Sequence, residues 1–108
     1  GDAAFGMVGM DLETAVRAEI PILTIVLNNG VMTHYDKNLP DAARLHDVHR
    51  LGGCYSGVAR ELGAHAERVE QPEAVRSALE RAVASTREGV PAVVEVMTKA
   101  EETVASYW

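Results

Sequence analysis

The sequence predicts an α/β protein built on a parallel sheet. Apolar residues recur at helical spacing in three segments, and a short predicted strand follows each of them; the first and the last of these strands are rich in aliphatic and β-branched residues. Strands that alternate with helices favour a parallel sheet with right-handed crossovers. With 108 residues, the chain is long enough for one domain around one core.

The first helix is predicted from about Val8 to Glu19, on the helical spacing of Val8, Leu12, Ala15 and Val16. It ends before Pro21 because a residue that precedes proline is disfavoured in the helical region. The run PILTIVLNN, residues 21–29, follows as a strand. Since this run is almost continuously aliphatic, we expect the strand to be buried on both faces, as in a parallel sheet.

A long connection, Gly30 to Arg50, follows the first strand and lacks clear periodicity. Only a short helical turn is expected in it, around residues 41–45, and connections of this length tend to be functional or mobile. The second helix ends at Gly63, which suits a helix C-cap. Its apolar face comprises Tyr55, Val58, Ala59 and Leu62.

Two more strands and a third helix complete the chain. HAERVE, residues 65–70, is a short strand, and a helix then runs from Pro72 to about Thr86. Its buried stripe comprises Val75, Leu79, Ala82 and Val83. VPAVVEVMT is the last strand, and residues 99–108 form a polar tail. The order is helix, strand, helix, strand, helix, strand, and because such sheets normally start with a strand, we expect the opening strands to be missing.

The composition excludes several classes of function. A net charge of −6 argues against nucleic acid as a partner, because a duplex binder needs a cationic stripe. The longest apolar stretch, Ile20 to Leu27, is too short to span a bilayer, and no charged-then-apolar leader is present. Cys54 has no internal disulfide partner and is expected to be buried or half-buried. We therefore expect a cytoplasmic protein with neither a membrane nor a nucleic-acid partner.

Polar residues stand where two predicted elements meet the same edge of the sheet. Asp2 is expected in a turn before the first helix, and Asn28 and Asn29 end the neighbouring strand. Carboxylate and amide oxygens suit Mg²⁺, and small residues around Asp2 let the main chain approach a phosphate. A simpler interpretation makes Asp2 a helix cap and the asparagines a turn. The combination and its spacing favour a metal-bound diphosphate.

The segment GDAAFGMVGMDLETAVRAEIPILTIVLNNG resembles the thiamine diphosphate motif of the acetolactate synthase and 2-oxo acid decarboxylase superfamily. That motif has a Gly-Asp-Gly opening and, after a helix and a strand, Asn-Asn. The resemblance extends more weakly to VPAVVEV. Ala3 departs from the commoner glycine, as in oxalyl-CoA decarboxylase and 2-hydroxyacyl-CoA lyase relatives. The resemblance implies a partial Rossmann-like domain, residues 1–108 being the C-terminal part of the diphosphate-binding domain of a longer subunit.

The resemblance also implies a role for each motif position. Asp2 and Asn29 would ligate Mg²⁺ through side-chain oxygens, and Val31 through its main-chain carbonyl. Thiamine diphosphate would be bound by Gly1, Ala3, Ala4, Asn28, Gly30 and Met32. The bound cofactor supplies chemistry at a C–C bond next to a carbonyl, in 2-oxo acid decarboxylation, acetolactate synthesis or acyl-CoA cleavage.

Catalytic residues stay open at this point. His34 and Tyr35 are candidates to face the substrate, although Tyr35 stands where pyruvate decarboxylases carry an acid, and solvated loop residues are the competing interpretation. Surface or hydrogen-bonded positions are expected for three other histidines, His46, His49 and His65. Packing against the core or the cofactor is expected for three methionines, Met7, Met10 and Met32.

The resemblance implies that the site needs more than this chain. In the family, a glutamate from a separate domain, usually on a partner subunit, activates the aminopyrimidine end of the cofactor. We therefore expect a homo-oligomer of longer subunits, and an inactive chain when the 108 residues stand alone. Two other classes remain open: a non-catalytic phosphate- or nucleotide-binding α/β module, and a structural interaction domain.

Overall fold

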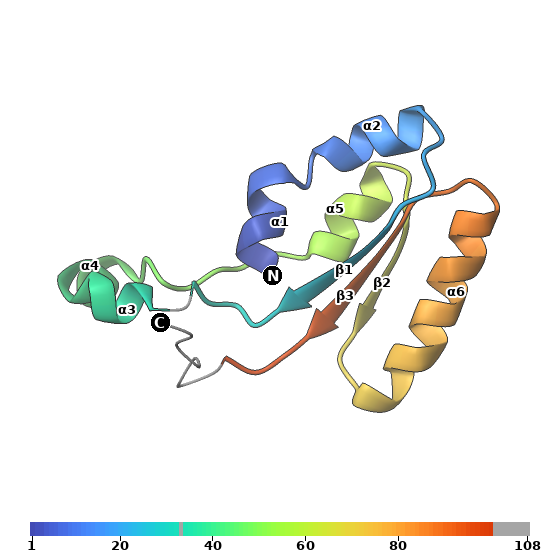
Figure 1. Ribbon diagram of the computed structural model, residues 1–108. Helices are drawn as coiled ribbons and strands as arrows, with labels where there is room; N and C mark the ends of the chain where they lie inside the picture. Colours follow the sequence, from blue (N-terminus) through green and yellow to red (C-terminus); the bar gives the residue numbers. More distant parts are fainter. Residues whose placement is uncertain (33, 101–108) are drawn as a thin grey trace, which may run out of the picture.

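The computed structural model describes residues 1–32 and 34–100, and it has the α/β architecture expected from the sequence (Figure 1). In this range, three parallel strands form one open sheet: β1 (Leu23–Asn28), β2 (His65–Val69) and β3 (Ala92–Met97). Their order is β1-β3-β2. Leu23 and His65 both pair with Ala92, so the strands run in step and their carboxyl ends share one edge. The sheet is that of a partial Rossmann-like domain.

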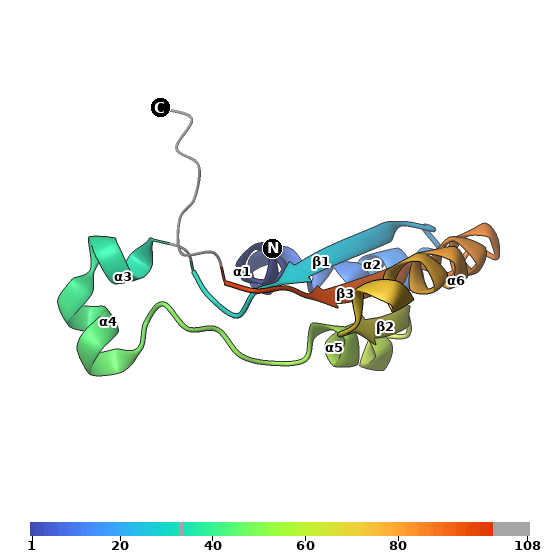
Figure 2. The same ribbon diagram turned by 90° about the horizontal axis from the view of Figure 1, so that it is seen from below.

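Helices cover both faces of this sheet (Figures 1 and 2). One face packs against α1 (Asp2–Val8), α2 (Asp11–Arg17) and α5 (Tyr55–Glu61). The other packs against α6 (Val75–Arg87), which follows a 3-10 turn, η1 (Pro72–Ala74). Because side chains alternate along a strand, Val93 and Val94 of β3 lie in different cores.

The first helical segment differs from the expectation of one helix over residues 8–19. It consists of two short helices, and α1 already begins at Asp2. The chain bends at Gly9, whose N–H donates to the Phe5 carbonyl at 2.6 Å. A Cβ on Gly9 would lie 2.6 Å from the Phe5 carbonyl oxygen as well as from the Phe5 ring, so any other residue would force the main chain of this bend to shift. Asp2, Ala3 and Ala4 therefore form the first turn of α1, and the expectation of a turn before the helix is wrong.

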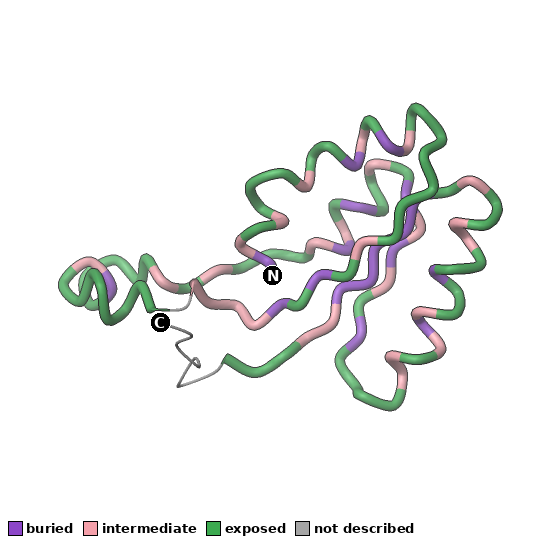
Figure 3. Tube along the Cα trace, viewed as in Figure 1, coloured by how far each residue is buried: buried purple, intermediate pink, exposed green. Residues whose placement is uncertain are grey.

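Strand β1 is buried on one face only, and the expectation of burial on both is wrong. Ile25 and Leu27 are exposed, whereas Val26 and Asn28 are buried. Figure 3 shows the resulting alternation of exposed and buried positions toward the end of this strand. The reason lies in α6, which packs through Ala78 and Ala82 against β3 and β2 and leaves that side of β1 uncovered. Among the described strands, β1 is thus an edge strand with an exposed aliphatic face.

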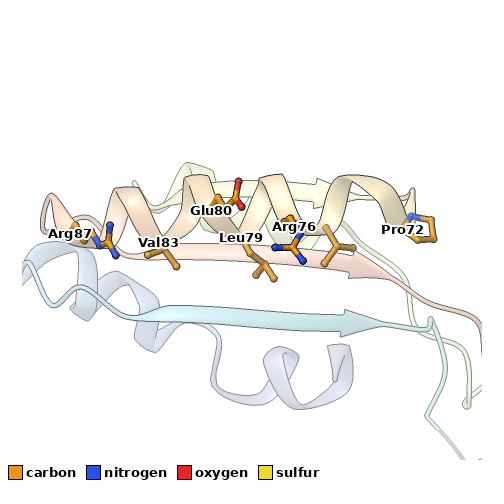
Figure 4. Close-up of a pocket in the computed structure, with 7 residues that line it drawn as sticks. Pro72, Arg76, Leu79, Glu80, Val83 and Arg87 are labelled. Carbon is orange, nitrogen blue, oxygen red and sulfur yellow. The ribbon is translucent and has the colours of Figure 1, made fainter.

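A hollow of about 700 Å³ follows the flank of α6. Figure 4 shows Leu79 and Val83 pointing from the helix toward the sheet, with Arg76 and Arg87 along the same flank. The small Ala78 and Ala82 lie at the buried centre of the helix, so the larger Val83 of the predicted stripe is left 36% exposed. None of the predicted site residues lines this hollow.

The connection after β1 contains two short helices that extend away from the sheet (Figure 2). The helical turn expected around residues 41–45 is confirmed as α4 (Pro40–His46), whereas α3 (Tyr35–Asn38) is not anticipated by the sequence. At its base the connection closes on itself. Val31 forms an antiparallel bridge with Arg50, and the Met32 N–H donates to the His49 carbonyl at 2.7 Å.

The remaining elements match their predicted positions. Helix α5 ends at Glu61, and Gly63, two residues on, has the φ of +96° expected for the glycine that terminates a helix. The N–H of Gly63 donates to Arg60 and that of Ala64 to Ala59, the paired bonds of a Schellman motif. Of the polar tail, residues 101–108 lie outside the described residues. Within the ranges that the structure covers, no helix is long and apolar enough to cross a membrane.

The ion pair between Glu67 of β2 and Arg81 of α6 gives a pH-dependent prediction. Arg81 donates to the two Glu67 oxygens at 2.8 and 2.6 Å, and these bonds hold the pKa of Glu67 below its usual value. A carboxylate with a lowered folded pKa stabilises the fold above its unfolded pKa, and this contribution is lost as pH falls through the folded pKa. Glu67→Gln should lower the free energy of unfolding at neutral pH by up to about 1 kcal/mol, since the pair is partly exposed.

Denaturant titrations at neutral and acidic pH check this prediction. The difference in free energy of unfolding between the native chain and Glu67→Gln should shrink in acid, because Glu67 is then protonated in the folded and in the unfolded chain. A difference that stays constant with pH would contradict it.

Candidate functional site

The two ends of the GDAAFG to LNNG segment meet at the carboxyl edge of the sheet. Asp2 is 2% exposed, and its Oδ2 accepts the N–H of Gly30 at 3.0 Å. Its Oδ1 accepts the N–H of Ala3, also at 3.0 Å. Gly30 has a φ of +70°, a conformation that glycine adopts without strain. The Asp2 carboxylate therefore ties the start of α1 to the loop that follows β1.

The two asparagines are held differently. Asn28 is buried, its Oδ1 accepts the Gly30 N–H at 3.1 Å, and its Nδ2 donates to Glu95 at 2.7 Å. Asn29 is half-buried, and its Oδ1 accepts the Val31 N–H at 3.1 Å. Asn28 is thus a buried support of the loop, whereas Asn29 lies at the accessible surface.

A hollow of about 630 Å³ opens beside these residues. Seven of the residues proposed from the sequence line it: Gly1, Asp2, Ala3, Ala4, Asn29, Val31 and Met32. Met7, which was expected to pack against the core or the cofactor, lines it as well, and so do three residues that the sequence did not indicate: Leu27, Thr98 and Lys99. Among residues 1–32 and 34–100, Lys99 is the one cation in this lining, so the hollow offers oxygen ligands and a positive charge together.

Four of the proposed residues lie outside this lining. Asn28 and Gly30 belong to the hydrogen-bonded support behind it. His34 and Tyr35 stand at the start of α3, where both are exposed, and neither lines the hollow. The structure therefore groups the proposed metal and diphosphate residues and leaves the two catalytic candidates apart from them.

The donor set fits Mg²⁺ bound together with a phosphate. The lining contains one carboxylate (Asp2), one side-chain amide (Asn29) and the main chain of Val31. No group of three or more His, Cys, Asp or Glu side chains that could hold a metal occurs in the part of the chain described. Mg²⁺ is commonly bound through one or two carboxylates with substrate phosphates and water, so this oxygen set suits a metal that a diphosphate helps to hold.

Glu95 is a residue of this region that the sequence analysis missed. It lies in the central strand β3 with no exposed surface, and its Oε2 accepts the Ser56 N–H at 2.8 Å and the Ser56 hydroxyl at 2.7 Å. Burial acts to raise the pKa of Glu95, but the hydrogen bonds from Ser56 and Asn28 outweigh it and lower that pKa. Arg68 of β2 lies 3.6 Å from Oε1. The sequence does carry a signal that could have identified Glu95, because it is the single acid within the apolar run VPAVVEV.

Several packing expectations are wrong or hold only in part. Met10, which precedes α2, is 64% exposed and packs against neither the core nor the hollow. Met7 is 74% exposed but lines the hollow, as Met32 does, so the expected contact of these two with the cofactor stays a prediction. His46 is exposed and His65 bonds to Glu67 at 3.0 Å, as expected. His49 instead has a buried Nδ1 without a hydrogen-bond partner among the described residues, at the point where the connection closes on Met32.

Cys54 is exposed, and the expectation of a buried thiol is wrong. The residue precedes α5 in an extended segment that does not contact the core. Hydrogen bonds from Ser56 and from the Gly57 N–H lower the pKa of this thiol. We expect Cys54 to be alkylated by iodoacetamide in the folded chain, and Ser56→Ala to slow this reaction near neutral pH by raising the thiol pKa. Rates measured against pH check this, and labelling that requires denaturant would contradict it.

Comparison with known proteins decides the family. Residues 1–96 match the model described as thiamine pyrophosphate enzyme, C-terminal TPP binding domain. The chain belongs to this family. The resemblance found in GDAAFG and LNNG is confirmed, and thiamine diphosphate is the cofactor that this TPP-binding family implies.

Relatives of this TPP-binding domain include three differently named enzymes. It is 42% identical over 101 residues to the acetolactate synthase large subunit of Mycobacterium tuberculosis, covering 91% of this chain and 18% of that protein. It is 33% identical over 104 residues to sulfoacetaldehyde acetyltransferase of Alcaligenes xylosoxydans, covering 94% and 17%. It is 32% identical over 106 residues to 2-hydroxyacyl-CoA lyase of Oryza sativa, covering 90% and 18%. The chain thus spans less than a fifth of the length of these relatives.

Proposed function

We propose that residues 1–108 are the C-terminal part of the diphosphate- and Mg²⁺-binding domain of a longer enzyme that makes or breaks C–C bonds next to a carbonyl. The observation that carries the proposal is the Asp2 carboxylate, buried and bonded to Gly30 at 3.0 Å, in the wall of a hollow that Asn29 and Val31 also line. The small share of each relative that the chain covers supports a longer subunit.

In this proposal, the residues of the hollow bind and orient the cofactor. Asp2, Asn29 and the Val31 carbonyl would hold Mg²⁺, which would supply the positive charge that a diphosphate needs. The main chain of Gly1 and Ala4 would face the phosphates, since N–H groups in a first helical turn have no intrahelical partner. Ala3 lines the same wall, but its N–H is bonded to Asp2 Oδ1. Asn28 and Gly30 shape the loop, and Met32 borders the cofactor. When bound, thiamine diphosphate supplies the carbon nucleophile for attack on a carbonyl.

The substrate class follows from the family and stays part of the proposal. Relatives are named as an acetolactate synthase, an acetyltransferase and an acyl-CoA lyase, so we propose a 2-oxo acid or an acyl-CoA as the substrate. His34 and Tyr35 remain candidates to face it from α3. Other domains and a partner subunit would complete the site, and the cytoplasm remains the proposed location.

The family match favours this enzyme over the two alternatives left open by the sequence. A structural domain in which Asp2 is only a helix cap is disfavoured, because Asp2 bonds to the distant Gly30 as well as to Ala3. A phosphate-binding module without catalytic function would use the same hollow, and it is the outcome that the following experiment separates.

Titration of the longer subunit with thiamine diphosphate, with and without Mg²⁺, tests the proposal. We expect binding that depends on Mg²⁺, and turnover of a 2-oxo acid or an acyl-CoA by the longer subunit. The isolated 108 residues should show no turnover. Binding of other phosphates without Mg²⁺-dependent binding of thiamine diphosphate would favour the non-catalytic module and overturn the proposed enzyme.

A further inference from the structure

Glu95 is not one of the proposed metal ligands or cofactor-binding residues. This buried acid nevertheless accepts a hydrogen bond from Asn28, which precedes the proposed ligand Asn29 in the chain. It has no exposed surface and lies on β3, between β1 and β2. A buried carboxylate is costly unless hydrogen bonds satisfy it, and Glu95 receives three, from Asn28 Nδ2, Ser56 N–H and Ser56 Oγ. These bonds join the end of β1 to the start of α5.

The donors fix the orientation of the Asn28 amide. A carboxylate can only accept, so Asn28 must turn its Nδ2 toward Glu95. Its Oδ1 then points the other way and accepts the Gly30 N–H at 3.1 Å. The same N–H is also bonded to Asp2 Oδ2. A chain of hydrogen bonds thus runs from Ser56 through Glu95 and Asn28 to the Gly30 loop.

We propose that Glu95 is a positioning residue for the cofactor site, setting through the Asn28 amide the conformation of the loop that carries Asn29 and Val31. This inference rests on the proposed function of that loop. Glu95 itself does not line the hollow and contacts neither metal nor cofactor in this arrangement. Its role is to impose a direction on the hydrogen bonds, so that the loop is already formed when the ligand arrives.

Glu95→Gln tests the direction of these bonds with almost no change in shape, and it also removes the charge that Arg68 faces, 3.6 Å from Oε1. The two Ser56 donors retain the oxygen of Gln, so its NH₂ group faces the Asn28 NH₂ group. The Asn28 amide must then turn over, and its NH₂ group meets the Gly30 N–H. We expect Mg²⁺-dependent affinity for thiamine diphosphate to fall by about 10- to 100-fold, the size found for outer partners of metal ligands.

The double variant Asn28→Asp with Glu95→Gln reverses the donor and acceptor between the two residues. The carboxylate introduced at position 28 would accept from the Gln NH₂ group and from the Gly30 N–H, and the total charge would be unchanged. We expect the double variant to recover most of the lost affinity. Glu67→Gln is the matched control, because it makes the same change in β2, away from the hollow, and should leave the affinity unchanged.

Hydrogen exchange of residues 28–32 in the longer subunit, without ligand, gives an independent measurement. Exchange should become faster in Glu95→Gln and slow again in the double variant. If Glu95→Gln destabilises the protein too far for titration, the melting temperatures of the native subunit, Glu95→Gln and the double variant are compared instead. Unchanged affinity and exchange in Glu95→Gln, or a double variant as impaired as the single one, would overturn the inference. Failure of the native subunit to bind thiamine diphosphate, with exchange responding as described, would instead overturn the proposed function alone.

Discussion

Asp2→Asn should abolish Mg²⁺-dependent binding of thiamine diphosphate in the longer subunit while leaving the fold intact. The substitution keeps the shape of a side chain that is 2% exposed, but it removes the charge and one of two acceptor oxygens. One oxygen accepts the Gly30 N–H and the other the Ala3 N–H, so an amide group places its NH₂ against one of these donors. Loss of a residue that only supports a metal ligand lowers metal affinity by about 10- to 100-fold, so loss of a charged ligand itself should lower the affinity further.

Isothermal titration with Mg²⁺ and thiamine diphosphate measures this effect, and thermal unfolding without ligand verifies the fold. Asp11→Asn is the matched control, since Asp11 is likewise an acid at the start of a short helix, α2, but is exposed and does not line the hollow. It should bind like the native protein. Native-like binding by Asp2→Asn would show that the carboxylate is only a structural link between α1 and the Gly30 loop.

The sheet and its order of elements were predictable because each strand has a strong local signature. The aliphatic run that becomes β1 and the apolar VPAVVEV that becomes β3 both lie between turn or proline signals. The helix that became α6 was predicted within a residue or two at its C-terminus, since apolar residues at helical spacing mark its course, and Pro72 marks the start of the 3-10 turn that leads into it. These elements depend on periodicity, which a single sequence contains.

Burial could not be predicted in the same way, because it depends on which neighbours cover each face. Ile25 has the composition of a core residue, yet it is 49% exposed because α6 lies over β3 instead of β1. The break at Gly9 depends on contact with Phe5, and α3 has only four residues, too few for a periodic signal.

The site shows the same division between local and distant information. The motif placed Asp2 and Asn29 by spacing alone, and both line one hollow in the structure. Glu95 and Ser56, by contrast, are 39 residues apart and meet only after the sheet forms. Lys99 and Thr98 likewise reach the hollow only because β3 ends beside β1. Residues that support a site from another strand thus require the topology as well as the motif.

Ala59→Leu should impair stability and cofactor binding together, because α5 serves both. Ala59 has no exposed surface and lies in the core with Val26 of β1 and Val93 of β3. A larger side chain there must push α5 away from the sheet, and such overpacking costs typically about 1–3 kcal/mol. The displacement acts on Ser56, in the first turn of the same helix, whose two bonds to Glu95 are 2.7 and 2.8 Å long.

Denaturant unfolding and titration of the longer subunit with thiamine diphosphate separate the two effects. Val58→Leu is the matched control, since Val58 is the adjacent residue of α5 but is 44% exposed and has room for the added carbon. Val58→Leu should change neither the free energy of unfolding nor the affinity for thiamine diphosphate. If Ala59→Leu lowers stability but leaves affinity intact, α5 does not support the loop through Ser56 and Glu95. If both fall, the small residue at position 59 is required because the helix that completes the core also holds the buried acid in place behind the cofactor site.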